Sequence, residues 1–226
     1  MSRMVLVCSA AIGCAVLSWL ILDNSYRYDV FASKAAQTSL EVTEAQSAEL
    51  MSSRRYSDML AYGTFGCMLA LTCALLASRG SYAVKLIALA PLLGFLGGAT
   101  GSLLAHVQDT QMLFVPNQIT YWVVRWAAIL VPIGLSCGIA FQLASKIAGG
   151  NYIVASILGA LVAAIIYCSI SGSYTAIESR QDIFPLASAN RLLVFLATSL
   201  SVALSMTLQT VKEATQEDTI SQDKAP

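Results

Sequence analysis

Long apolar runs alternate with short polar segments along most of this chain. Runs of about 20 apolar residues begin near Met4, Leu60, Val84, Trp122, Tyr152 and Leu186. A helix needs about 20 such residues to cross a hydrocarbon core of about 30 Å, so each run is long enough for one crossing. The alternation typical of a membrane β-barrel strand does not occur, and unpaired backbone amides in lipid are costly. The pattern therefore predicts an all-α membrane protein, a polytopic bundle of about six transmembrane helices.

The same pattern divides the chain into four parts. Residues 1–22 are expected to form an uncleaved transmembrane anchor, because the apolar run of about 19 residues exceeds the h-region of a signal peptide, which is the alternative. Residues 23–58 form a polar connection without Pro or Gly, and its composition fits a helix or a solvated loop equally well. Residues 59–211 hold five further spans, and residues 212–226 are expected to be a frayed polar tail.

Small residues recur at a spacing of four in successive spans. Lipid tails are as apolar as leucine, so membrane helices associate through close backbone contacts at such residues. The spacing places each set on one helix face. Spans two to five are therefore expected to pack tightly through Gly and Ala, although both are common in membrane helices generally. The glycines predicted to make these contacts are Gly94, Gly97, Gly98, Gly101, Gly134, Gly138 and Gly159.

Composition supports the same environment and limits the partners. Hydrophobic residues make up 57% of the chain and charged residues 12%, with a mean hydropathy of +0.68. An ordinary soluble domain has roughly 25% charged residues. The expected partners are the lipid bilayer and, within it, other membrane proteins or a second copy of the chain. Nucleic acid is disfavoured because no basic cluster exceeds the Arg54-Arg55 pair.

Basic residues in the short connections predict the orientation. Arg79 and Lys85 mark the second connection and Lys146 the fourth, and such residues favour the cytoplasmic side. With six spans, both termini are then cytoplasmic, in a membrane that is expected to be a bacterial inner membrane. The bias is modest, because four basic residues in segment 23–58 would lie outside.

Ionisable residues near the hydrocarbon are the candidates for a functional site. Arg125 and Arg191 begin the fourth and sixth spans, and both are interpreted as anchors whose side chains reach the headgroups. His106, the sole histidine, ends the third span and is followed by Asp109. On the predicted topology, His106, Asp109, Arg125 and Arg191 share the outer face, where they could form a shallow polar site.

Motifs of catalysis and cofactor binding are missing from the sequence. The six cysteines are scattered singly through the spans, so neither a metal site nor a cofactor is expected. Rhomboid-type serine proteases carry G-x-S-G and a later histidine, whereas Ser169-Ile170-Ser171-Gly172 lacks the first glycine and follows His106. The glycine-rich spans resemble uncharacterised bacterial inner-membrane proteins in composition alone, which implies no activity.

The sequence favours a non-enzymatic membrane bundle with a structural, assembly or interaction role. The alternative is a transporter of small solutes or ions, with a site near the third and fourth spans, where Pro91 and Pro132 are expected to kink the helices. A third, more distant hypothesis is an enzyme that acts on outer-face lipid headgroups with His106, Arg125 and Arg191. Transport requires polar residues converging at mid-membrane, whereas a structural bundle fills that space with Gly and Ala.

Overall fold

The computed structural model contains six helices and, in the part of the chain that it describes, no strand. It describes the backbone of residues 3–37, 44–78, 83–111, 118–145, 151–174 and 188–222, and the side chains of 4–24, 52–78, 88–108, 120–145, 151–171 and 188–212. The helices are α1 (Arg3–Gln37), α2 (Glu44–Ala77), α3 (Ala83–Gln111), α4 (Gln118–Ser145), α5 (Tyr152–Tyr174) and α6 (Ser188–Gln222). All six are long and apolar enough to cross a membrane. The predicted fold class is confirmed.

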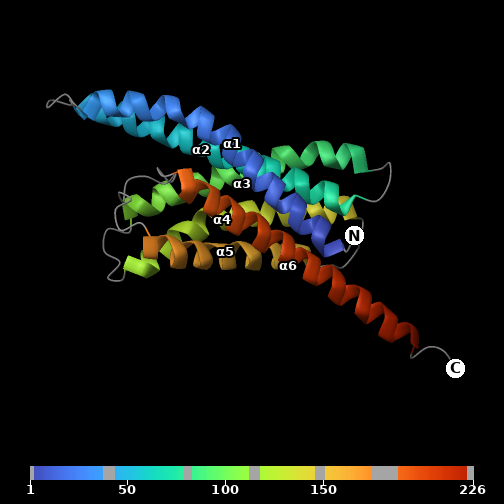
Figure 1. Cartoon of the computed structure of the whole chain (residues 1–226). Helices are drawn as coiled ribbons and strands as arrows, with labels where there is room; N and C mark the ends of the chain where they lie inside the picture. The colour runs from blue at the N-terminus through green and yellow to red at the C-terminus, as the bar shows by residue number, and fades with distance from the viewer. Residues whose placement is uncertain are drawn as a thin grey trace.

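The helices lie side by side and alternate in direction, so both termini are at the same end of the bundle (Figure 1). Each helix from α2 to α6 packs on its neighbours in sequence, α2 also packs on α4, and α1 packs on α6 and α2. At one end, α1 and α2 extend together past the other helices (Figure 1). We call this the arm end, and the opposite end, which holds both termini, the tail end.

Two polar segments contain more helix than the sequence analysis predicted. α1 continues to Gln37 and α2 begins at Glu44, so helix covers most of the 23–58 connection, while residues 38–43 lie outside the described part. α6 continues to Gln222, so the backbone of residues 212–222, for which a frayed tail was expected, is helical. The segment 212–222 has no Gly or Pro and contains Ala, Glu, Lys and Gln, which favour helix.

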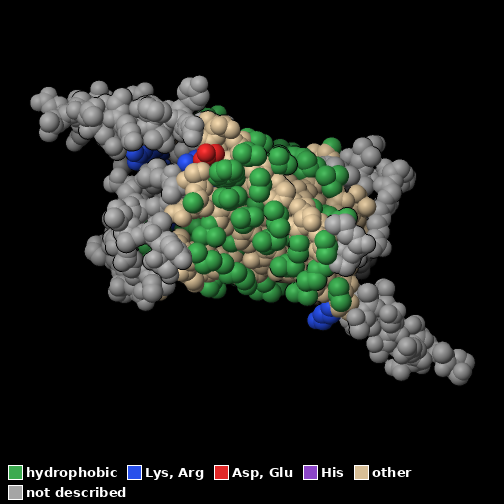
Figure 2. All heavy atoms as spheres, in the orientation of Figure 1, with side chains coloured by type: hydrophobic (Ala, Val, Ile, Leu, Met, Phe, Trp, Pro, Cys, Tyr) green, Lys and Arg blue, Asp and Glu red, His purple; other side chains and the backbone are tan. Residues whose placement is uncertain are grey.

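The side of the bundle between its two ends is apolar. On the face shown in Figure 2, hydrophobic side chains cover much of this middle zone, and the described Lys, Arg, Asp and Glu side chains lie near the ends. On α5, Val154, Leu158 and Ile165 are each more than half exposed. A continuous apolar surface of this extent on a helical protein fits a lipid bilayer.

Glycines of α3 contact two neighbouring helices. Gly94 and Gly98 face the α2 backbone at Gly66 and Tyr62, where an added Cβ would overlap carbonyl oxygens. On another side of the helix, a Cβ on Gly97 would lie 2.6 Å from the Pro132 carbonyl oxygen of α4. These backbones approach too closely for a methyl group, so glycine sets the helix spacing here.

The remaining glycines of the predicted set continue the pattern along the chain. Gly101 faces Ile129 of α4. Cβ atoms on Gly134 and Gly159 would lie 2.7 Å from the carbonyl oxygens of Ser156 on α5 and Ser201 on α6, respectively. Gly138 also meets α5, at Ser156 and the backbone before it. Each successive helix pair from α2 to α6 therefore contains at least one contact that excludes a Cβ atom.

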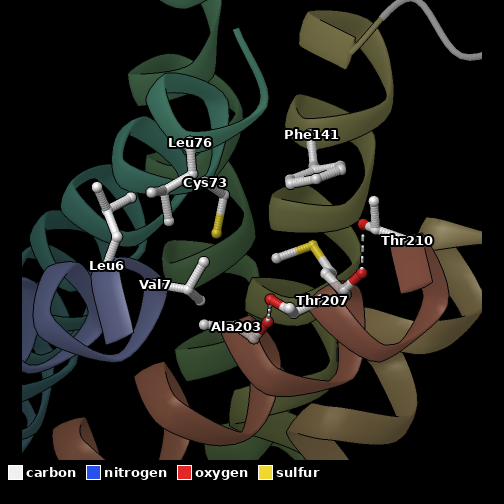
Figure 3. A pocket seen from close by; sticks show the side chains of 9 residues that line it. Leu6, Val7, Cys73, Leu76, Phe141, Ala203, Thr207 and Thr210 are labelled. Carbon is white, nitrogen blue, oxygen red and sulfur yellow. Dashed lines mark hydrogen bonds between the residues drawn. The ribbon is translucent and has the colours of Figure 1, made fainter. Parts of the chain in front are cut away.

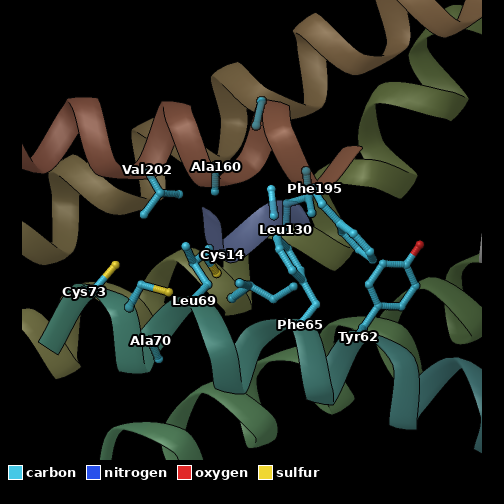
Figure 4. Close-up of a cluster of buried hydrophobic side chains, with 14 of the residues drawn as sticks. Cys14, Tyr62, Phe65, Leu69, Ala70, Cys73, Leu130, Ala160, Phe195 and Val202 are labelled. Atoms are coloured by element: carbon cyan, nitrogen blue, oxygen red, sulfur yellow. The ribbon is translucent and has the colours of Figure 1, made fainter. Parts of the chain in front are cut away.

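Large side chains fill the space between α2, α4, α5 and α6. The Phe65 and Phe195 rings stack with centroids 4.3 Å apart and join α2 to α6. Trp126 of α4 meets Tyr167 of α5 at 4.4 Å and Tyr62 of α2 at 6.4 Å. Figure 4 shows this core, with Phe65, Phe195 and Leu130 between the helices. The described interior is thus mainly aromatic and aliphatic, as expected of close-packed helices.

Candidate functional site

The arm end buries an aspartate and the only histidine in contact with each other. Asp58 Oδ2 of α2 lies 3.2 Å from His106 Nε2 of α3, and the two side chains are 5% and 14% exposed. The helix register explains the contact, because Gly94 faces Gly66 and Gly98 faces Tyr62, which places Asp58 opposite Ser102 on the next turn. His106 follows Ser102 by one turn on the same face of α3, within reach of the carboxylate. A carboxylate buried this deeply requires such a partner.

A second ion pair joins the first and last spans. Asp23 Oδ1 of α1 lies 3.2 Å from Arg191 Nη1 of α6. One turn away, the Trp19 indole Nε1 donates to the Ser188 carbonyl oxygen at 3.1 Å and to its Oγ at 2.9 Å. These contacts fix how α1 lies on α6 at the arm end.

Arg125 is the most deeply buried charge in the described part of the chain. Its side chain is 1% exposed, and its guanidinium carbon lies 5.2 Å from the Trp122 ring centroid and 6.0 Å from that of Tyr121. The predicted headgroup anchoring is therefore wrong for Arg125 and also for Arg191, which is 7% exposed. Arg125 precedes the fully buried Ile129 by four residues, so it shares the helix face that points into the protein.

The structure places three of the four residues predicted to form an outer-face polar site at one end of the bundle. His106, Arg125 and Arg191 all lie at the arm end and are largely buried, and their neighbours include Asp58, the Trp122 ring and Asp23, respectively. The side chain of Asp109 lies outside the described residues. Sequence reasoning missed Asp58 and Asp23, because both were assigned to the polar connection. The sequence contained a signal for the burial of Asp58, because this residue precedes the buried Tyr62 by one helical turn and shares its helix face.

The arrangement contains the residue types of a Ser-His-Asp triad. Ser102 of α3 precedes His106 by one turn, and Asp58 contacts the imidazole from α2. Nucleophilic catalysis requires that the serine oxygen reach a substrate carbonyl. Ser102 is 0% exposed within the α2–α3 interface, so a substrate cannot approach it in this arrangement. Among the described residues, no three His, Cys, Asp or Glu side chains are grouped to hold a metal.

A small cavity of about 40 Å³ lies near the tail end, between α1, α2, α4 and α6 (Figure 3). Its lining is mainly apolar, and the hydroxyl groups of Thr207 and Thr210 donate to the carbonyl oxygens of Ala203 at 2.8 Å and Met206 at 3.0 Å. The lining residues are Leu6, Val7, Cys73, Leu76, Phe141, Ala203, Met206, Thr207 and Thr210. A cavity of this size holds a water molecule but not a metabolite.

Comparisons with models of known families, with curated proteins and with solved structures found no match. In the part of the chain that the structure describes, apolar helix surfaces and glycine contacts between successive helices are combined with buried charges at the arm end.

Proposed function

We propose that this chain is a non-enzymatic integral membrane protein whose closed helical bundle has a structural, assembly or interaction role. The observation that carries the proposal is the contact between α3 and α4. Gly97 lies against Pro132 and Ser136, and Gly101 lies against Ile129, so backbone fills the region between the two proline-containing helices. A transporter with a site near these helices would need space for its solute there.

The arm supports an interaction role. α1 and α2 contain 35 and 34 residues, which correspond to about 50 Å of helix at about 1.5 Å per residue. A hydrocarbon core is about 30 Å thick, so each helix is long enough to continue about 20 Å beyond it. The proposed partners are other membrane proteins or a second copy of the chain, which the arm would contact outside the bilayer.

Transport of small solutes or ions is the second candidate. The buried Asp58–His106 pair favours it, because ionisable side chains within spans commonly mark ion or substrate pathways. The position of the pair weighs against it. Asp58 and His106 lie near the arm end of their spans, Ser52–Ala77 and Ala88–Gln108, rather than at mid-membrane.

Thiol accessibility distinguishes the two candidates. Cys14, Cys73 and Cys137 are at most 4% exposed and face the interior from three different helices. A charged, membrane-impermeant thiol reagent applied to both sides of the membrane should leave them unmodified until the protein is denatured. Ser53→Cys, at an exposed position of the arm end, is the positive control. If the reagent modifies any of the three native thiols, and a transported solute slows that modification, the transport function would be supported and the bundle proposal would be wrong.

We further place both termini in the cytoplasm of a bacterial inner membrane, on the basis of the basic residues in the second and fourth connections. A reporter enzyme that works only in the cytoplasm should be active when it is fused after Pro226. If a reporter that works only outside the cytoplasm is active there instead, the termini lie on the outer side, and the bundle proposal is unaffected.

A further inference from the structure

α1 joins the bundle by a different kind of contact from the other five helices. Gly13, the glycine of its span, has no atom within 4 Å of an added Cβ, so it makes no close backbone contact of the kind made by α3. The buried face of α1 includes Val7, Ala11, Cys14 and Ser18. Its attachment must therefore come from these side chains.

The register between α1 and α6 is fixed at two points. Asp23 pairs with Arg191 at the arm end, and Ala11 packs with Ala203 in a small apolar cluster toward the tail end. The two helices are antiparallel, so the same register continued between these points places Ser199 opposite the turn that holds Cys14 and Ser18. Polar side chains of two helices therefore meet near the middle of the span Met4–Asn24.

The third side of this meeting point is α2. Cys14 belongs to the same buried cluster as Leu69 and Cys73 of α2 and Val202 of α6, and Figure 4 shows it between those helices. Three hydroxyl groups lie within interaction range of its thiol, those of Thr72, Ser18 and Ser199. Thr72 donates to its own helix, at the Met68 carbonyl oxygen, at 2.8 Å.

The other two hydroxyls have no such bond. Ser18 and Ser199 are both 0% exposed, and neither Oγ makes a hydrogen bond of good geometry within the described part of the chain. Burial of an unbonded hydroxyl is unfavourable, and a water molecule with two to four polar partners commonly relieves it. Serine and cysteine side chains from facing helices, close to the bilayer centre, supply such partners here.

We propose that Cys14, Ser18, Thr72 and Ser199 form a binding site for one water molecule at the centre of the membrane, and that this water joins α1 to α2 and α6. The ligand is small, neutral and able to donate and accept hydrogen bonds. Ionic ligands are excluded by the lack of a charged side chain among the four. This site is separate from the charges at the arm end and from the contact that closes α3 against α4.

The tail-end cavity lies next to the site. It lies between α1, α2, α4 and α6, is lined by Val7, Cys73 and Ala203, and its volume of about 40 Å³ is sufficient for a water molecule. Cys73 is the neighbour of Thr72 in sequence, and Ala203 follows Ser199 by one turn. Leu6, at the cavity edge, is half exposed. Space for a water molecule therefore exists within about one helical turn of the polar site.

A double-mutant cycle tests the shared water. Ser18→Ala and Ser199→Ala should each raise the unfolding equilibrium constant by about fivefold, the effect of one hydrogen bond. If both serines hold the same water, the double variant should resemble either single variant, with a coupling of about fivefold. Ser136→Ala is the control, because that buried hydroxyl already donates to the Pro132 carbonyl oxygen at 2.9 Å and should show no coupling to Ser199→Ala.

Two results would overturn the proposal. Alanine substitutions that stabilise the protein would show that the hydroxyls are dry, because removal of an unbonded buried hydroxyl removes its desolvation cost. Effects of the two substitutions on the unfolding equilibrium constant that simply multiply would show that the two serines share no water. The infrared S–H stretch provides a second readout that does not depend on stability. The band lost in Cys14→Ala should exchange in D₂O and should shift in Ser199→Ala. A Cys14 band that neither exchanges nor shifts would also refute the site. The outcome of the charged-reagent experiment is independent, since a site for one water does not admit such a reagent.

Discussion

Substitution of Gly97 by alanine is the sharpest test of the glycine contacts. The added Cβ would lie 2.6 Å from the Pro132 carbonyl oxygen and 2.9 Å from the Ser136 Cβ, whereas ordinary van der Waals contact begins at 3.4 Å. The α3 and α4 backbones would have to separate by several tenths of an ångström, because a helical carbonyl cannot rotate away. Overpacking of this kind costs about 1–3 kcal/mol. The higher helix propensity of alanine offsets about 1 kcal/mol of that cost.

A backbone carbonyl at 2.6 Å cannot yield as a side chain can, so the cost lies at the upper end of that range, and the expected net result for Gly97→Ala is a loss of about 2 kcal/mol in the free energy of unfolding. Gly13→Ala is the matched control, because an added Cβ there meets nothing within 4 Å. It should leave stability unchanged or raise it by up to about 1 kcal/mol. Unfolding by SDS in mixed micelles, followed by circular dichroism, measures both variants. A Gly97→Ala variant as stable as the parent, or equal losses in the two variants, would refute the reasoning.

Three further predictions concern the arm end. Asp58→Asn and His106→Gln should each destabilise the protein by about 2 kcal/mol. The double variant should lose little more stability than either single variant, because both substitutions remove the same contact. Additive losses in a thermal unfolding assay would contradict the pairing. Trp19→Phe should cost about 1 kcal/mol through loss of its bonds to Ser188, and an unchanged melting temperature would argue against that contact. A fluorophosphonate probe should not label Ser102 in the folded protein, and labelling that disappears in His106→Gln would instead reveal a working serine nucleophile.

The sequence was sufficient to predict the number and type of the elements. Apolar length alone separates a span from a loop, because the bilayer imposes a fixed thickness on every crossing. The residues at which each span begins and ends were harder to predict from the sequence. The second span was expected from Leu60 but extends back to Ser52, because a helix without Gly or Pro continues through polar residues as readily as through apolar ones.

The charged site could be predicted only in part. His106, Arg125 and Arg191 were recognised as ionisable groups near the membrane, but hydropathy along a chain does not show which face of a helix points inward. The stripe from Arg125 to Ile129 and Ile133, both fully buried, contained that information for the arginine. The pairing of Asp58 with His106 depends on how two helices align, and a single sequence does not encode that alignment in a readable form.

Water-edited solid-state NMR of glycine-labelled protein in lipid bilayers tests most directly the claim that this is a closed membrane bundle. The Cα signals of Gly97 and Gly101, which lie between α3 and α4, report whether water reaches that interface. We expect them to receive almost no magnetisation from water at short mixing times. Rapid transfer to these two glycines would show a hydrated passage between α3 and α4 and would contradict the closed bundle.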